Sequence, residues 1–290
     1  MNAKTKLCCL IGKPVGHSIS PLIHNTIADR LGINLVYTAF SVDSDKVADA
    51  IRGAKALGIQ GMNVTVPHKC EVIRYLDEID PLAEKIGAVN TIVTTENGYK
   101  GYNTDIIGLK RQLEDEGITI KDKEIIILGA GGASKAITYL CAQEGAFRIW
   151  LLNRTFDRAE ELAAEVNSYF GNVVEPLELQ DYHKIPEGKY PVIQTTSVGL
   201  YPNVDNAAIE DEEFYELVEA GVDIIFNPRE TKFMRKCKEH GASAFNGLKM
   251  LLYQGVAAFE LWNDVEVDAK LSSQVLELME KEMQAKGEET

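Results

Sequence analysis

The sequence predicts an α/β protein of two domains, an N-terminal α/β domain with a mainly parallel sheet and a second domain of the Rossmann type. Apolar strands and amphipathic helices alternate from residue 7, and a second alternating series begins near residue 124. A glycine-rich loop, GAGGAS, directly follows the first strand of that second series. With 290 residues, 45% of them hydrophobic, the chain can bury two ordinary cores.

The first domain begins as strand, helix, strand, helix, strand. The expected elements are LCCLIG at 7–12, PLIHNTIADRLG at 21–32, LVYTAFSV at 35–42, DKVADAIRGAKALG at 45–58 and MNVTVP at 62–67. Ser20 before Pro21 combines a capping residue with proline at the first helical position, so a helix should start there. Gly32 and Gly58 lie where helices commonly end.

Further along the chain, helical stretches are expected at 69–76 and 81–88. The segment NTIVTTENGYKGYN predicts a hairpin that turns at Asn97-Gly98. A helix over 105–117 then leads into the second series, which places the domain break near residue 106.

The two domains are therefore expected at 1–105 and 106–247. A helix from about Lys249 to Trp262 has core-like periodicity, and we expect it to pack back on the first domain, which C-terminal helices of about 248–290 would complete. The strands expected in the second domain are 124–128, 148–152, 192–199 and 223–227.

Composition excludes several classes of protein. The formal charge of −14 opposes nucleic-acid binding, because counterion release needs a basic surface. No apolar run is long enough for a signal peptide or a membrane segment. The five cysteines are odd in number and lack a repeated spacing, which fits a reducing cytoplasm, and the five histidines lack metal-ligand spacing, so no metal is expected.

The glycine-rich loop predicts a dinucleotide site. Glycines let the backbone approach a pyrophosphate, whose charge the N-terminus of the following helix stabilises. The motif is imperfect, because Ser134 takes the third glycine position, and a simple tight turn is the alternative. The strand-loop-helix-strand spacing favours nucleotide binding. The loop consists of Gly129, Ala130, Gly131, Gly132 and Ala133, followed by Ser134.

The end of the second strand of this series predicts which nucleotide binds. An NAD-binding protein commonly places Asp or Glu there, on the ribose 2′-hydroxyl. Three other polar residues stand there instead, Asn153, Arg154 and Thr155. A guanidinium suits a 2′-phosphate, and Arg158 about one turn later adds a second cation, so NADP is predicted. The alternative is a surface arginine paired with Asp157 or Glu160.

Polar segments follow the strands of the first domain, at 12–21, 63–69, 90–91 and 103–105. Ligands of open α/β sheets lie at the carboxyl ends of the strands, so these segments should converge. They offer hydroxyls, amides, one lysine and one carboxylate. Such groups can recognise a polyhydroxylated carboxylic acid.

The motifs GKPVGHSISPLIHN, NVTVPHK, GAVNT, GYNTD, GAGGAS, NRT, TTSVG and GLKMLLYQ occur in this order. On these motifs the chain resembles the shikimate dehydrogenase family from Leu7 to about Trp262. The resemblance implies NADPH-dependent, reversible reduction of 3-dehydroshikimate to shikimate, in the chorismate route to aromatic amino acids, in a cleft between the two domains. It also implies that the shikimate pocket is lined by Ser18, Ser20, Thr65, Lys69, Asn90, Asp105 and Gln254. The implied cofactor contacts are residues 129–133, 153–158 and Gly247.

Lys69 and Asp105 are the candidate catalytic residues. Hydride transfer to a ketone develops negative charge on its oxygen, which a cationic proton donor such as Lys69 would stabilise while Asp105 holds the ammonium. Taken alone, Lys69 would be a solvated lysine and Asp105 a helix N-cap, and Asp105 could fill both roles. Ser18 and Ser20 are expected to bind the substrate carboxylate, although loop stabilisation, with Ser20 capping its helix, is the alternative.

Four further residues complete the interpretation. Phe226 stands where the family usually has a tyrosine on the substrate side, and Gln194 replaces a frequent asparagine. His17 and His24 are expected to be structural, because Lys69 already supplies the proton.

Three other classes of protein are alternatives to a shikimate dehydrogenase. A quinate/shikimate dehydrogenase would turn over quinate with NAD or with either cofactor. A catalytically silent paralogue that binds shikimate and nucleotide would not need both Lys69 and Asp105. A methylenetetrahydrofolate dehydrogenase would not need HSISP or NRT. The oligomeric state stays open between monomer and homodimer.

Overall fold

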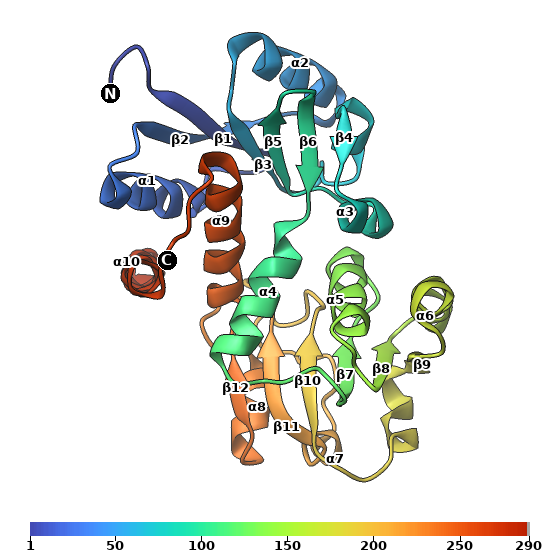
Figure 1. Ribbon diagram of the computed structural model, residues 1–290. Coiled ribbons are helices and arrows are strands. Elements are labelled where there is room, and N and C mark those ends of the chain that lie inside the picture. Colours follow the sequence, from blue (N-terminus) through green and yellow to red (C-terminus); the bar gives the residue numbers. More distant parts are fainter. Residues whose placement is uncertain (289–290) are drawn as a thin grey trace. The chain divides into compact units, whose positions relative to one another are not determined.

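The computed structural model describes residues 1–288, and their side chains as far as residue 285 (Figure 1). The described chain forms two compact units, one made of residues 1–108 and 251–288, the other of Leu109–Met250. Each unit holds a sheet of six strands in the described part of the chain, with helices against it. The predicted two-domain α/β fold class is confirmed.

The sheet of the first unit has the order β2-β1-β3-β5-β6-β4. Its strands are β1 (Lys6–Gly12), β2 (Leu35–Ser41), β3 (Gly61–Val64), β4 (Glu78–Ile79), β5 (Thr91–Thr95) and β6 (Gly98–Tyr102). Strand β1 pairs in parallel with β2 and β3, β4 pairs in parallel with β6, and β5 runs antiparallel to both of its neighbours. The carboxyl ends of β1 and β3 therefore lie at one edge.

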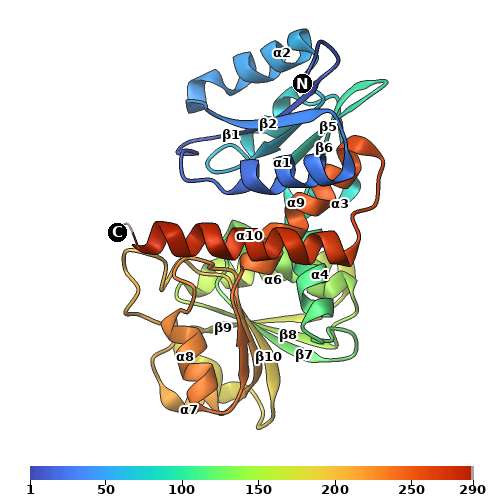
Figure 2. The ribbon, with the colours of Figure 1, turned by 90° about the vertical axis from the view of Figure 1, so that its left-hand side faces the viewer.

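The helices of the first unit are α1 (Ser20–Leu31), α2 (Val47–Leu57), α3 (Pro81–Ile86), the first part of α4 (Thr104–Asp115), most of α9 (Leu248–Asn263) and α10 (Ala269–Glu288). Helices α1 and α2 lie on opposite faces of the sheet (Figure 2). The predicted helix ends are confirmed, since Gly32 and Gly58 adopt left-handed φ values of 66° and 67°. Short 3-10 helices span Ser44–Lys46 and Glu71–Tyr75.

Helix α9 joins the first unit through Trp262. The indole N–H of Trp262 donates to the carbonyl of Ile92 at 2.9 Å, and a Cβ at Gly61 would lie 2.1 Å from that indole nitrogen. Only glycine therefore fits at the start of β3. On the other face, α2 covers a core that includes Ile11, Ile51 and Val64.

The sheet of the second unit is parallel in every pair, in the order β12-β11-β10-β7-β8-β9. Its strands are β7 (Glu124–Leu128), β8 (Arg148–Asn153), β9 (Val174–Glu178), β10 (Tyr190–Gln194), β11 (Val218–Asp223) and β12 (Ser243–Phe245). Its helices are α5 (Gly132–Gln143), α6 (Phe156–Phe170), α7 (Glu212–Tyr215) and α8 (Lys232–Glu239), with a 3-10 helix at Leu179–Lys184. Counted along the chain, this strand order is 3-2-1-4-5-6, the doubly wound order of dinucleotide-binding sheets.

Two predicted strands were placed wrongly in the second unit. The run 223–227 follows a strand instead of forming one, because β11 occupies Val218–Asp223. The strand was not recognised because Glu219 and Gly221 interrupt its apolar pattern. Gly221 is nevertheless required, since a Cβ there would lie 2.8 Å from the Cys237 sulfur. The strand predicted at 192–199 ends at Gln194, where the loop TTSVG begins. Strands β9 and β12, at the sheet edges, were missed.

Three predictions in the first unit also need correction. Strand β3 ends at Val64, and much of the helix expected at 69–76 is a 3-10 helix. The hairpin turns at Glu96-Asn97, because Thr95 pairs with Gly98. Gly98 belongs to β6 with a φ of 121°, and a Cβ there would lie 2.2 Å from the Asp77 carboxylate.

Candidate functional site

Ser18 and Ser20 are hydrogen-bonded to each other at the start of α1. The Ser18 hydroxyl lies 3.1 Å from the Ser20 hydroxyl, and the Ser20 backbone N–H donates to Ser18 Oγ at 3.2 Å. The prediction that Ser20 caps the helix is wrong, because Ser20 lies in the first turn and Ile19 occupies the cap position. Because Ile19 has no side-chain oxygen, Ser18 Oγ accepts a backbone N–H of the first helical turn, that of Ser20. Both hydroxyls thus lie at the positive end of a helix dipole.

Thr65 lies beside the loop that carries these serines. The Thr65 backbone N–H donates to the carbonyl of Ile11 at 2.9 Å, and the Lys13 N–H donates to the carbonyl of Val66 at 3.0 Å. Gly12 allows this approach, because a Cβ there would lie 2.3 Å from the Thr65 methyl group. The segments that follow β1 and β3 therefore meet, as the strand order requires.

Lys69, Asp105 and Asn90 form one cluster. The Lys69 ammonium donates to Asp105 Oδ2 at 2.7 Å, and the Asn90 amide donates to Asp105 Oδ1 at 2.8 Å. The Lys69 and Asp105 side chains are 31% and 23% exposed, so both remain accessible to a ligand. Since an ammonium has three N–H groups, Lys69 keeps two for a substrate.

Asp105 is not the helix cap that the sequence allowed. Helix α4 begins at Thr104, and the side chain of Asn103 accepts the Asp105 backbone N–H at 3.2 Å. Because Asn103 takes the capping role, the carboxylate of Asp105 is available for Lys69 and Asn90.

The orientation of Asn90 is determined by three donors. Its Oδ1 accepts the Thr104 N–H at 2.7 Å, the Thr104 hydroxyl at 3.1 Å and the Thr91 hydroxyl at 3.0 Å. Its amide nitrogen must therefore face Asp105. Asn90 is 3% exposed, so this geometry is built into the core.

A buried polar network behind this cluster was not predicted. Asn63 donates to the Thr91 hydroxyl at 3.0 Å, while its Oδ1 accepts the Tyr37 hydroxyl at 2.8 Å and lies 3.1 Å from His24 Nε2. Complete burial lowers the pKa of His24 to about 3, so His24 is neutral and cannot serve as an acid. The only available sequence signal was the polar Asn63 within an apolar strand.

Gln254 lies in the part of α9 that belongs to the first unit. Its amide N–H donates to the carbonyl of Leu251 at 2.9 Å, within its own helix. The hydrogen bonds within the described chain do not join Gln254 to the other six predicted substrate residues.

The glycine-rich loop forms the turn between β7 and α5. Gly129 has a φ of 110°, and a Cβ there would lie 2.7 Å from the Thr195 hydroxyl, so a side chain is excluded on both counts. Gly131 and Gly132 instead face open space at the N-terminus of α5, as does Ala133, which is exposed. The backbone here is accessible to an anion such as pyrophosphate.

Asn153 connects the glycine-rich loop to the end of β8. Its Oδ1 accepts the Ala130 N–H at 3.2 Å, and its amide donates to the Thr155 carbonyl at 2.8 Å. Arg154, Thr155 and Arg158 are exposed. Among the residues that the structure describes, neither arginine is in an ion pair, including one with Asp157 or Glu160. Two uncommitted guanidinium groups beside a hydroxyl fit a 2′-phosphate.

Gly247 is the last predicted cofactor residue. Its N–H donates to the carbonyl of Ile225 at 3.0 Å, and a Cβ would lie 2.1 Å from the carbonyl oxygen of Ile224. Gly247 is therefore required by packing against the segment that contains Phe226.

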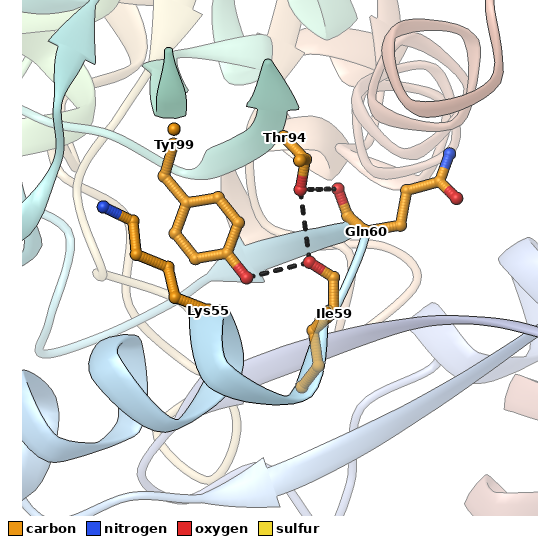
Figure 3. A pocket seen from close by; sticks show the side chains of 7 residues that line it. Lys55, Ile59, Gln60, Thr94 and Tyr99 are labelled. Carbon is orange, nitrogen blue, oxygen red and sulfur yellow. Dashed lines mark hydrogen bonds between the residues drawn. The ribbon is translucent and has the colours of Figure 1, made fainter. Parts of the chain in front are cut away.

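A hollow of about 520 Å³ lies elsewhere in the first unit, at the amino end of β3 (Figure 3). Tyr99 and Thr94 both donate to the carbonyl of Ile59, and Lys55 pairs with Asp77. Its polar groups thus bond to each other. It contains no predicted site residue and lies at the sheet edge opposite Thr65.

The described residues contain neither a cluster of side chains suited to a metal ion nor a helix suited to span a membrane. No group of three or more His, Cys, Asp or Glu side chains there is arranged to hold a metal ion. Helices that combine the length and the apolar character of a membrane span do not occur in this part of the chain.

Family models match three successive parts of the chain. The shikimate dehydrogenase substrate binding domain matches residues 10–92, and the shikimate / quinate 5-dehydrogenase model matches residues 110–231. The shikimate 5'-dehydrogenase C-terminal domain matches residues 247–277.

Individual relatives resemble the chain over most of its length. A shikimate dehydrogenase (NADP(+)) of Methanocaldococcus jannaschii is 44% identical over 270 residues, covering 92% of this chain and 94% of the relative. A crystal structure of a shikimate dehydrogenase in complex with NADP+ has a TM-score of 0.86 and 42% identity, covering 95% of this chain and 96% of that one. A shikimate 5-dehydrogenase from Listeria monocytogenes in complex with shikimate and NAD has a TM-score of 0.88 and 31% identity, covering 95% and 98%.

Proposed function

The chain belongs to the shikimate dehydrogenase family, and we propose that it catalyses the reversible, NADPH-dependent reduction of 3-dehydroshikimate to shikimate for chorismate and aromatic amino acid biosynthesis. The observation that carries this proposal is the cluster of Lys69, Asp105 and Asn90, in which an accessible ammonium is held by a carboxylate. Such an arrangement suits proton transfer to a carbonyl oxygen. The presence of both ionic residues argues against a silent paralogue.

In the proposed reaction Lys69 gives a proton to the carbonyl oxygen as the carbonyl carbon is reduced. NADPH, when bound, supplies the hydride. Lys69 also stabilises the negative charge that develops on the oxygen, and Asp105 keeps the ammonium in place. Asn90 holds Asp105 from its other side, so the pair is oriented before substrate binds.

Each unit has one proposed ligand. The first unit binds shikimate, with Ser18 and Ser20 on the carboxylate and with Thr65, Asn90 and Gln254 on other polar groups. The second unit binds NADP through the glycine-rich loop, Gly247 and residues 153–158. Its strand order and its exposed glycines support this assignment.

We propose that the enzyme acts in the cytoplasm as a monomer or homodimer and takes a small-molecule substrate. Its net charge of −14 supports the absence of a nucleic-acid partner. No metal is required by the proposed mechanism, because Lys69 supplies both the proton and the positive charge.

The proposal is tested by measuring the oxidation of shikimate and of quinate with NADP and with NAD, followed by absorbance of the reduced nicotinamide. Shikimate with NADP is expected to give the highest kcat/KM. Efficient turnover of quinate, or equal use of NAD, would instead support a quinate/shikimate dehydrogenase. This alternative is relevant because one relative was crystallised with shikimate and NAD.

Ser18→Ala is expected to raise the KM for shikimate by about tenfold to a hundredfold, because a hydrogen bond to a charged group contributes roughly 1.5–3 kcal/mol. The carboxylate is bound in both the ground state and the transition state, so kcat should change much less. Steady-state kinetics at saturating NADP measure both quantities. Ser273→Ala is the matched control, because Ser273 is an exposed serine of the same unit that bonds within α10. A Ser18→Ala enzyme with a KM within twofold of the wild type would show that these hydroxyls stabilise the loop and do not bind the carboxylate.

A further inference from the structure

Two buried polar side chains connect the loop that follows β10 to the segment that follows β11, at the carboxyl edge of the second sheet. These are Gln194, the last residue of β10, and Asp223, the last residue of β11, which pair directly across the two strands. Both are 0% exposed. Buried polar groups of this kind cost free energy unless they are bonded, so their partners show what they hold.

Gln194 holds the loop that follows β10. Its Oε1 accepts the Thr196 N–H at 2.6 Å, and its amide nitrogen lies 3.3 Å from each of the carbonyls of Thr196 and Val198. The same nitrogen lies 3.3 Å from Asp223 Oδ1. One side chain thus bonds to the backbone of Thr196 and Val198 and connects this loop to the neighbouring strand.

Asp223 holds the segment that follows β11. Its Oδ1 accepts the Ile225 N–H at 2.9 Å, and its Oδ2 accepts the Thr231 hydroxyl at 2.7 Å. Burial raises the pKa of Asp223 to about 6. Burial also raises the pKa of the Cys237 thiol and that of the Tyr215 hydroxyl, the two groups whose pKa Asp223 influences, so both remain neutral. Within the described part of the chain, Asp223 is therefore buried without a cation partner and is held by hydrogen-bond donors.

Both loops support glycines of the proposed cofactor site. Thr195 donates its hydroxyl to the carbonyl of Leu128 at 2.7 Å, and the space at Gly129 is filled by Thr195 and Thr196. Ile225 accepts the N–H of Gly247. A shift of either loop would therefore move the backbone at Gly129 or Gly247.

We propose that Gln194 and Asp223 are positioning residues for NADP(H), which set the two loops against which Gly129 and Gly247 pack. This inference rests on the proposed function, because it assigns the second unit to NADP. It also explains why an amide at position 194 is useful, since an amide can accept from Thr196 with its oxygen and donate to Asp223 with its nitrogen.

The test compares NADPH binding in Gln194→Met with binding in a matched control, Asn167→Leu. Methionine has the length of glutamine and no strong donor or acceptor. Asn167 is also an amide that holds a loop of the same sheet, bonding to the backbone of Val173 and Val174 at its opposite edge. Asp223→Ala and Asp223→Asn form a second pair, because asparagine retains an acceptor for Ile225 and can donate to Thr231.

The Kd of NADPH, measured by nicotinamide fluorescence on the free enzyme, is expected to rise about tenfold or more in Gln194→Met and Asp223→Ala. Asp223→Asn and Asn167→Leu should remain within about threefold of the wild type, and melting temperatures identify any general loss of stability. The KM for shikimate should remain within about twofold in all four variants, because Lys69 and Asp105 lie in the other unit.

Two results would overturn the inference, namely an unchanged NADPH Kd in Gln194→Met or an equal rise in Asn167→Leu. Weak binding of NADPH by the wild type would instead contradict the proposed function itself. If Gln194→Met does not fold, the Asp223 pair alone decides the outcome.

Discussion

Lys69→Ala is expected to lower kcat for shikimate oxidation by about 10²-fold or more, because the ammonium acts on charge that appears mainly in the transition state. The KM for shikimate should change much less. Steady-state kinetics with saturating NADP measure both constants, and a melting temperature shows whether the fold is intact. The loss should not be recovered at high substrate concentration, since the missing interaction belongs to the chemical step.

Lys55→Ala provides the matched control for Lys69→Ala. Lys55 is also a lysine of the first unit that pairs with an aspartate, Asp77, but it lies near the amino end of β3. Its removal should leave kcat within about twofold. A Lys69→Ala enzyme that retains near wild-type kcat would refute the assignment of Lys69 as proton donor, and Asp105 would then have to be reconsidered with it.

Arg154→Ala is expected to remove most of the preference for NADP over NAD. Two charge-assisted phosphate contacts of roughly 1.5–3 kcal/mol each imply a wild-type preference in kcat/KM of about 10² or greater. The substitution should lower kcat/KM with NADP and leave kcat/KM with NAD almost unchanged, because NAD has no 2′-phosphate for the guanidinium to bind. Added salt should weaken NADP binding more than NAD binding. Initial rates with each cofactor at low and high ionic strength measure these effects.

The control for Arg154→Ala is an arginine at the other end of the same strand. Arg148 begins β8, where it lies near Glu175 and over the ring of Trp150. Arg148→Ala should lower stability without changing the ratio of NADP to NAD efficiencies. Equal use of the two cofactors by the wild-type enzyme would refute the interpretation of residues 153–158 and favour the quinate/shikimate alternative.

Local sequence patterns predicted the helices and strands whose ends are marked by residues with a specific backbone preference, such as glycine. Gly32 and Gly58 end helices because glycine adopts positive φ without steric cost. The strand EIIIL and the loop GAGGAS predicted β7 and the start of α5, because an apolar run and glycines were adjacent. Sequence patterns did not predict strands in which a residue is required by its packing contacts and has a low strand propensity. Gly221 lies inside β11 because Cys237 packs against it, and periodicity alone could not reveal this contact.

The sequence by itself determined the fold class, the strand-loop-helix unit of the second domain and the residue types available for chemistry. Only the tertiary structure decided which of these residues meet. Lys69 and Asp105 are separated by 36 positions, and they bond because Asn103 caps α4 and Asn90 holds the carboxylate. Likewise, Gln194 and Asp223 join because β10 and β11 are neighbours in register. The physical reason is that hydrogen bonds of buried side chains must be satisfied by whatever the folded chain brings within about 3 Å, and strand order determines those partners.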